Sequence, residues 1–115
     1  MLRIEMVTID CRDPRALAEW WARQVDGRVL EGFEGDEYLM VATDGGPRLG
    51  FQRVAEPTPG KNRVHLDLAA PDRELEVDRL LTDGALEVAR HEEGGFAWVV
   101  LSDPEGNHFC VSQAH

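Results

Sequence analysis

The residues of this chain that are best suited to chemistry occupy alternating positions in its expected β-strands. His65 and Asp67 are two residues apart in one such segment, and Cys110 lies between His108 and Ser112 in another. Alternate side chains of a strand point to the same face of a sheet. An imidazole beside a carboxylate suits general-base chemistry, and an imidazole beside a thiol suits either a nucleophile or a soft metal ion.

The alternation of polar and apolar side chains extends over four expected strands. One parity is apolar and is expected to face the helices: Val7, Ile9, Cys11, Leu49, Phe51, Val64, Leu66, Leu68, Phe109 and Val111. The other parity is mostly polar: Met6, Thr8, Asp10, Arg48, Gly50, Gln52, Arg63, His65, Asp67, His108, Cys110 and Ser112. A face this polar is either solvated or lines a pocket, and we expect a pocket because His, Arg and Asp converge there.

Each of these polar groups also has a purely structural interpretation. Side chains at i and i+2 of a strand are usually too far apart for a direct hydrogen bond, so we expect His65 to bond to backbone or water instead of Asp67. A nucleophilic Cys110 would need the imidazole within reach and donors for an oxyanion, neither of which the sequence shows. Arg48 and Arg63 either recognise a carboxylate or phosphate group at the pocket rim or are solvated charges.

Three tryptophans suggest a stacking surface for a ligand. Trp20 and Trp21 are adjacent on an expected helix and therefore about 100° apart, so we expect one in the core and the other in a lid or dimer contact. Trp98 shares its parity with Phe96 and Val100, and its ring is expected to form a wall of the pocket.

An internal repeat predicts the fold. The segment Met6-Val-Thr-Ile-Asp-Cys-Arg-Asp13 and the segment His65-Leu-Asp-Leu-Ala-Ala-Pro-Asp72 each precede a helical pattern, so each half is a β-α-β-β-β module. The expected strands are 3–11, 27–33, 37–43, 48–54, 62–70, 85–91, 95–102 and 107–113; the expected helices are 14–25 and the segment from Asp72 to Gly84, and a turn is expected at Glu34-Gly-Asp36.

Length and composition favour one α+β domain over residues 1–115, with module 1 at about 1–54, a linker at 55–61 and module 2 at about 62–115. The net charge of −10 disfavours nucleic acid and anionic membranes as partners. No run approaches about 20 apolar residues, and the N-terminal residues have no signal-peptide pattern, so a bacterial cytoplasm with both thiols reduced is expected.

The sequence resembles the vicinal oxygen chelate superfamily, which includes glyoxalase I, extradiol dioxygenases and bleomycin-resistance proteins. The resemblance rests on the paired strand-Asp-helix starts, on Lys61-Asn-Arg-Val-His-Leu-Asp-Leu68 and on Leu101-Ser-Asp-Pro-Glu-Gly-Asn107. It is strongest to small glyoxalase-like domains of the actinobacterial type. It implies a cup-shaped, curved mixed sheet with helices on its convex side, usually in a homodimer.

The resemblance also implies where a divalent metal would bind. Its ligands, typically His or Gln, Glu, His and Glu, fall here on Met6, Gly50, His65 and Cys110, of which only His65 matches. We therefore expect no metal and no other cofactor. A soft-metal site that uses Met, His and Cys donors is a less favoured alternative.

The leading functional prediction is metal-independent binding of a small organic ligand, with sequestration in the manner of bleomycin-resistance proteins. Its candidate contacts are Arg48, Gln52, Arg63, His65, Asp67, Trp98 and Cys110, and the catalytic candidates are His65 and Asp67. The alternative is a metal-dependent lyase or isomerase of the glyoxalase type that uses His65 and unconventional ligands. A third is an interaction domain without a small ligand. The sequence leaves open whether any reaction is catalysed.

Overall fold

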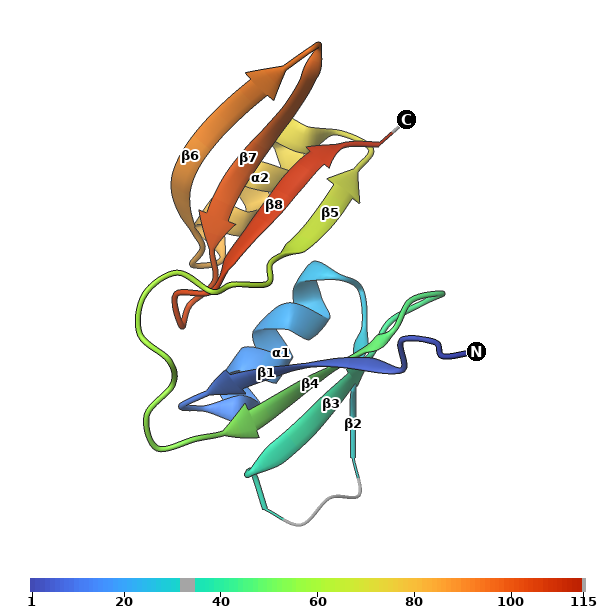
Figure 1. The fold of residues 1–115 in the computed structure, drawn as a ribbon, viewed down its shortest axis with the longest axis vertical. Helices are drawn as coiled ribbons and strands as arrows, with labels where there is room; N and C mark the ends of the chain where they lie inside the picture. Colours follow the sequence, from blue (N-terminus) through green and yellow to red (C-terminus); the bar gives the residue numbers. More distant parts are fainter. Residues whose placement is uncertain (32–34, 115) are drawn as a thin grey trace. The chain divides into compact units, whose positions relative to one another are not determined.

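The computed structural model describes residues 1–31 and 35–114, which form two compact units, Met1–Pro57 and Thr58–His115. Each unit is a β-α-β-β-β module (Figure 1). The first contains β1 (Met6–Cys11), α1 (Pro14–Gln24), β2 (Arg28–Leu30), β3 (Tyr38–Ala42) and β4 (Arg48–Arg53). The second contains β5 (Leu66–Ala70), α2 (Arg73–Thr82), β6 (Leu86–Glu93), β7 (Phe96–Ser102) and β8 (His108–Gln113). The predicted α+β class with two such modules is confirmed; the assignment of both modules to one domain stays a prediction.

The first unit has a four-stranded mixed sheet in the order β1-β4-β3-β2. β1 runs parallel to β4, and the other two pairs are antiparallel. Helix α1 packs against β2, β3 and β4 and begins where the Asp13 carboxylate accepts a hydrogen bond from the Ala16 amide at 3.1 Å. Pro14 occupies the first turn of α1, where backbone N–H groups make no hydrogen bond within the helix. Its lack of an N–H therefore costs nothing there.

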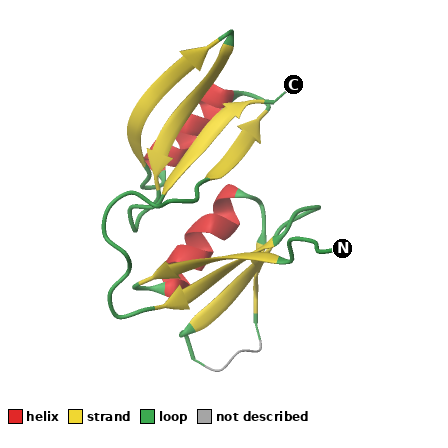
Figure 2. Ribbon diagram, in the orientation of Figure 1, coloured by secondary structure: helices red, strands yellow, loops and turns green. Residues whose placement is uncertain are grey.

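The second unit repeats this plan with the strand order β5-β8-β7-β6. β5 is parallel to β8, and Asp67 is the register partner of Cys110. Asp72 caps α2 by accepting from the Leu75 amide at 3.2 Å, and this helix packs against β5 and β8. In both units the helix covers one face of the sheet (Figure 2), so the opposite face is left for other contacts.

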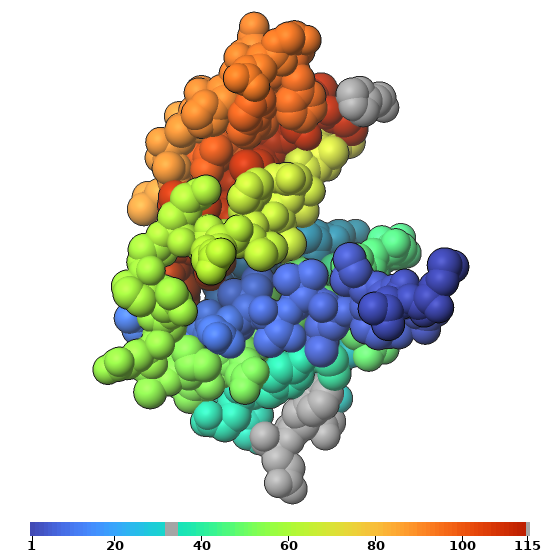
Figure 3. Space-filling view, viewed as in Figure 1, coloured from blue at the N-terminus to red at the C-terminus, as the bar shows by residue number. Residues whose placement is uncertain are grey.

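The core of each unit combines one parity of its strands with the apolar face of its helix. Of the side chains predicted to face the helices, those on β4 and β8 and that of Cys11 are buried, whereas Val7, Ile9, Leu66 and Leu68 are half-buried. The most buried side chains of the first unit are Cys11, Leu17, Trp21, Leu39, Val41 and Phe51, and those of the second are Val77, Val99, Leu101, Phe109 and Val111. The stretch between β4 and β5 lies largely at the surface (Figure 3). Among the described residues, no helix is long and apolar enough to span a bilayer.

Two predicted strands begin later than expected. The strand expected from residue 3 starts at Met6, and the one expected from residue 62 starts at Leu66. Before β5, the Asn62 amide nitrogen donates to the carbonyls of Val64, at 2.6 Å, and His108, at 3.0 Å. These side-chain bonds hold the segment outside the regular ladder, so Val64 is 76% exposed and does not face the helix as expected.

The strand expected at 27–33 is observed as Arg28–Leu30, and the expected Glu34-Gly-Asp36 turn lies partly outside the described residues. The prediction for the adjacent tryptophans is wrong. Trp20 and Trp21 are both buried, with their rings edge to face at 5.1 Å. The buried positions of α1, at i, i+1, i+3 and i+4 from Leu17, form an apolar face wide enough for both rings.

Candidate functional site

The sheet face of the second unit that lies opposite α2 contains a hollow of about 700 Å³. Its lining includes His65 and Asp67 at the start of β5, Trp98 on β7, and His108, Cys110 and Ser112 on β8. These side chains share one parity, because core residues such as Phe109 and Val111 alternate with them. The predicted polar face therefore borders a concave surface in this unit.

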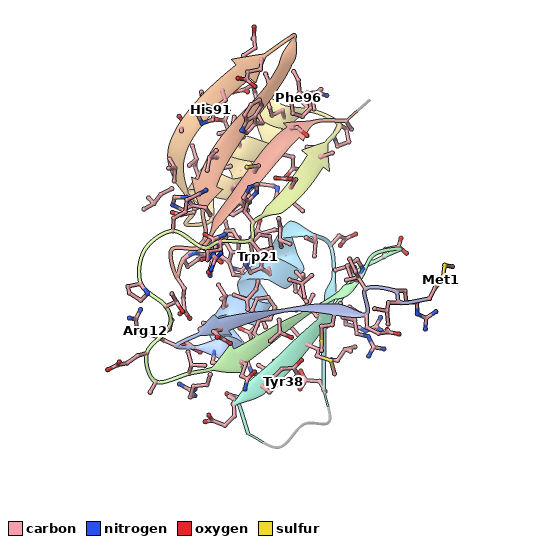
Figure 4. The ribbon with its side chains drawn as sticks, viewed as in Figure 1. Met1, Arg12, Trp21, Tyr38, His91 and Phe96 are labelled. Carbon is pink, nitrogen blue, oxygen red and sulfur yellow. The ribbon has the colours of Figure 1, made fainter. Side chains whose placement is uncertain are left out.

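An aromatic wall closes one side of the hollow. The Trp98 ring stacks on His91 of the neighbouring strand, with centroids 5.2 Å apart and planes at 29°. Phe96 also neighbours Trp98, with ring centroids 5.6 Å apart and planes tilted by 33°, and is 48% exposed. Figure 4 shows His91 and Phe96 on the β6–β7 hairpin. These neighbouring aromatic rings, partly open to solvent, present an apolar surface to a planar ligand.

A cluster of three reactive groups lies in the same hollow. His65 Nδ1 is 3.0 Å from Asp67 Oδ1 and 3.9 Å from Cys110 Sγ. The expectation that His65 and Asp67 do not bond directly is therefore wrong. That expectation assumed that both residues belong to a regular strand. His65 precedes Leu66, the first residue of β5, so the side-chain separation of a regular strand does not apply to it.

This geometry does not form a catalytic triad. An ionised carboxylate only accepts hydrogen bonds, so the His65 Nδ1 that contacts Asp67 carries the proton. The thiol of Cys110 approaches that same nitrogen and cannot transfer its proton to it. A cysteine nucleophile with His65 as its base is not supported by this arrangement.

The electrostatics of Cys110 lead to the same conclusion. Burial of the thiol raises its pKa above the ordinary 9.0, and the Asp67 carboxylate raises it further by its charge and by accepting a hydrogen bond. The Lys61 ammonium acts in the opposite direction, and its effect is smaller. Because both leading causes disfavour the thiolate, Cys110 is a neutral thiol at pH 7.

Alkylation of Cys110 is expected to reflect this raised pKa. In a Cys11→Ser background, the rate of reaction with iodoacetamide should reach half its maximum at a higher pH in the folded chain than in urea. Asp67→Asn should move that midpoint down and accelerate the reaction at pH 7.5, because only the thiolate reacts. Mass spectrometry of quenched samples gives the rates. A midpoint in the folded chain at or below the midpoint in urea would contradict the raised pKa of Cys110.

In the first unit, the space beside Gly50 on the corresponding sheet face is occupied by other side chains of that unit. The Tyr38 hydroxyl donates to Met6 Sδ at 3.1 Å, directly beside Gly50. A Cβ atom at Gly50 would lie 2.7 Å from Tyr38 Oη and 2.8 Å from Thr8 Oγ1. Figure 4 shows Tyr38 on β3. The space beside Gly50 is therefore filled by neighbouring side chains.

The predicted ligand contacts divide between the two units. His65, Asp67, Trp98 and Cys110 all line the hollow of the second unit. Arg48 and Gln52 lie exposed on β4 in the first unit, opposite Met6 and Asp10. Arg63 is exposed before β5 and is not among the residues that line the described hollow. Their roles in ligand binding stay predictions.

Sequence reasoning missed His91, Lys61 and Glu93 as lining residues. His91 is the register partner of Trp98 in the β6–β7 hairpin. The tight turn at Glu93-Gly-Gly-Phe96 is the signal that would have revealed this pairing, because a short turn fixes the register of a hairpin.

The family of the chain follows from a comparison with known proteins. A family model described as a glyoxalase-like domain matches residues 6–112, nearly the whole chain. The chain belongs to the glyoxalase-like domain family. Its membership of the vicinal oxygen chelate superfamily, predicted from the sequence, is confirmed. A sequence search of curated proteins finds no match.

Solved structures support the glyoxalase-like fold at low sequence identity. A glyoxalase/bleomycin resistance protein/dioxygenase family enzyme from Burkholderia phytofirmans PsJN is 22% identical, with a TM-score of 0.80 over 99% of this chain and 100% of the other. A superfamily member from Sphaerobacter thermophilus is 14% identical, with a TM-score of 0.76 over 99% and 98%. TnmS3, an antibiotic binding protein from Streptomyces sp. CB03234, is 19% identical, with a TM-score of 0.71 over 100% and 98%.

The residues of the first unit do not provide the metal ligands that the superfamily implies. Gly50 offers no donor, and the space for a longer side chain is taken by Tyr38 and Thr8. The sulfur of Met6 accepts a hydrogen bond from Tyr38 and is a poor ligand for a hard divalent ion. The two remaining positions, His65 and Cys110, lie in the second unit. The superfamily's set of imidazole and carboxylate ligands is thus not reproduced.

Proposed function

We propose that this glyoxalase-like protein binds a small, planar organic molecule in the hollow of its second unit. The observation that carries the proposal is the group of neighbouring rings, His91, Trp98 and Phe96, along one side of that hollow. A planar ring laid against Trp98 would bury apolar surface on both partners without ordering long, flexible side chains. This is the arrangement expected for sequestration of an intact ligand.

The polar end of the hollow defines the kind of group that the ligand presents. When the His65 ring carries a single proton, on Nδ1, its Nε2 has an acceptor lone pair, and the Asp67 carboxylate is 72% exposed. Both groups accept hydrogen bonds. A ligand with hydroxyl or amino substituents on its aromatic system therefore fits better than a carboxylate, and the net charge of −10 also disfavours anions.

A structural relative with this fold, TnmS3, is an antibiotic binding protein. Fold similarity alone does not select a ligand, so the choice of an aromatic compound rests on the lining of the hollow. Homodimerisation, a cytoplasmic location and a bacterial source also belong to the proposal; the first is tested by sedimentation equilibrium of the full chain.

A second candidate function is a metal-dependent lyase or isomerase of the glyoxalase type. The cluster of His65, Asp67 and Cys110 favours it, because their ligand atoms lie within 4.8 Å of one another. This function requires turnover that depends on an added ion, whereas sequestration requires tight binding and no product. Ligand binding measured in EDTA with product analysis by mass spectrometry separates the two.

Replacement of Trp98 is the direct test of the proposed binding. Proflavine and a hydroxylated anthraquinone are suitable probes, and each should raise the melting temperature in EDTA, because a ligand that binds the folded state stabilises it. Trp98→Ala should weaken binding by about 10-fold, which is roughly 1.4 kcal/mol of lost stacking and burial. Isothermal titration calorimetry gives the affinities.

Tyr38→Phe is the matched control, since it alters an aromatic residue of the first unit and leaves the hollow unchanged. It should retain the affinity of the parent chain for both probes. If circular dichroism shows that Trp98→Ala is folded and it binds the probes as tightly as the parent chain, the ligand does not bind against Trp98. Loss of binding in Tyr38→Phe would place the ligand elsewhere.

A further inference from the structure

We propose that the hollow of the second unit selects planar aromatic cations, and that Glu93 is the residue that recognises their positive charge. The proposal rests on the proposed function, because it takes the aromatic wall as the surface on which the ligand lies. It adds the charge of the ligand and the place of that charge, at the tip of the β6–β7 hairpin. Glu93 thereby becomes a specificity-determining residue of the binding site.

The turn between β6 and β7 fixes the position of Glu93 on the hollow. Its two central residues, Gly94 and Gly95, have positive φ angles of 57° and 82°, as tight hairpin turns of this kind require. Glu93 is accordingly the register partner of Phe96, and both residues line the hollow. Directly opposite side chains of an antiparallel pair have Cβ atoms about 4.5 to 5.5 Å apart. The Glu93 side chain therefore begins beside the Phe96 ring.

A ligand that stacks on the aromatic wall comes within reach of this carboxylate. The pair of His91 and Trp98 follows the pair of Glu93 and Phe96 two residues along the hairpin, a step of about 7 Å on the same face. A plane of three fused rings is longer than this step, so a ligand centred on Trp98 extends to Glu93. The face of an indole ring also attracts a cation more strongly than other aromatic rings do.

The negative charge of Glu93 is not neutralised by the protein itself. Within residues 1–31 and 35–114, no hydrogen bond or ion pair involves the Glu93 side chain. Arg90 is the nearest basic residue along the chain, and its guanidinium is held by Glu87 at 2.9 Å and by Glu74 at 2.8 Å. Arg90 is also absent from the lining of the hollow. The Glu93 carboxylate is therefore left for a cation that arrives from solvent.

The other charged residues of the lining lie towards the opposite end of the hollow. Lys61 and Asp67 both act on the pKa of the Cys110 thiol, in opposite directions. Cys110 is the register partner of Val100, which is four residues along β7 from the partner of Glu93, or about 13 Å. At that end an ammonium group offsets a carboxylate, whereas Glu93 has no such counterpart. The ligand's positive charge is therefore expected at the hairpin tip.

Two planar probes with the same amino substituents test the role of charge. Proflavine is a cation at neutral pH, whereas 2,6-diaminoanthraquinone is an uncharged molecule of similar shape. The full chain in EDTA at low salt should bind proflavine at least about 5-fold more tightly than the anthraquinone. Glu93→Gln should weaken proflavine binding by about 5-fold and change anthraquinone binding by less than about 2-fold. Proflavine fluorescence anisotropy gives the first affinity, and displacement of proflavine gives the second.

Glu92→Gln is the matched control, because it removes the same charge from the neighbouring residue. Glu92 pairs with Ala97 and does not line the hollow, so this variant should keep the affinity of the parent chain for both probes. Equal proflavine affinity in the parent and in folded Glu93→Gln, or an equal loss in Glu92→Gln, would overturn the proposal.

The two probes also separate this proposal from the one on which it rests. If the anthraquinone binds and proflavine binds no more tightly, the selection of cations is refuted and the binding of planar ligands is retained. If neither probe binds the parent chain, both proposals are refuted. Added sodium chloride should weaken proflavine binding more in the parent than in Glu93→Gln, because salt screens the attraction between exposed charges.

Discussion

Replacing Asp103 by alanine is expected to lower the free energy of unfolding by about 3 kcal/mol. Asp103 directly follows β7, is 3% exposed and organises the turn to β8. Its carboxylate accepts from the amides of Glu105, at 2.9 Å, and Asn107, at 3.0 Å, and from the Asn107 side chain at 2.9 Å. Alanine leaves two partly buried backbone donors without their acceptor, and each such loss costs about 1 to 3 kcal/mol.

Urea unfolding followed by far-UV circular dichroism measures this change. Asp103→Asn keeps one carbonyl acceptor and should lose about half as much stability, since its amide nitrogen cannot accept from Asn107. Asp44→Ala, at an exposed turn of the first unit, is the matched control and should change stability by less than about 0.5 kcal/mol. A loss below about 1 kcal/mol in Asp103→Ala would show that water replaces the carboxylate and that the turn does not depend on it.

Gly50→Glu restores the carboxylate that the superfamily's metal site implies, but it should not restore that site. The new Cβ atom would lie 2.7 Å from Tyr38 Oη, 2.8 Å from Thr8 Oγ1 and 3.2 Å from Met6 Sδ. Contacts under 3.0 Å force neighbours to move, and overpacking of this kind costs about 1 to 3 kcal/mol. We expect a loss of about 2 kcal/mol in stability and no gain in binding of Mn²⁺ or Mg²⁺ by calorimetry.

A double variant identifies the cause of that loss. Tyr38→Phe removes the nearest atom, so Gly50→Ala should cost less in a Tyr38→Phe background than in the parent chain. The difference between the two costs is the coupling between the hydroxyl and the added methyl group. Additive effects would mean that the crowding arises from Thr8 or Met6. Tight Mn²⁺ binding by Gly50→Glu would show that the side chains around Gly50 move aside.

Local patterns in the sequence were sufficient to predict most of the fold. The paired starts at Asp13 and Asp72 predicted both helices, because an N-cap followed by apolar residues at helical spacing is a local signal. The apolar parity of β4 and β8 predicted Phe51 and Phe109 as core residues, because strand alternation is fixed by backbone geometry. Strand ends were less predictable. The start of β5 depends on hydrogen bonds between Asn62 and His108, which belongs to a strand that is distant in the sequence.

The sequence by itself determined the superfamily, the two modules and the set of polar residues from which a site is built. Only the tertiary structure decided which of them meet. It brought Cys110 to His65 and His91 to Trp98, because strand pairing joins segments that no local pattern relates. It also filled the space at Gly50 with Tyr38, which lies on a different strand. Short-range propensities act within a few residues along the chain, whereas a binding site depends on the register between strands.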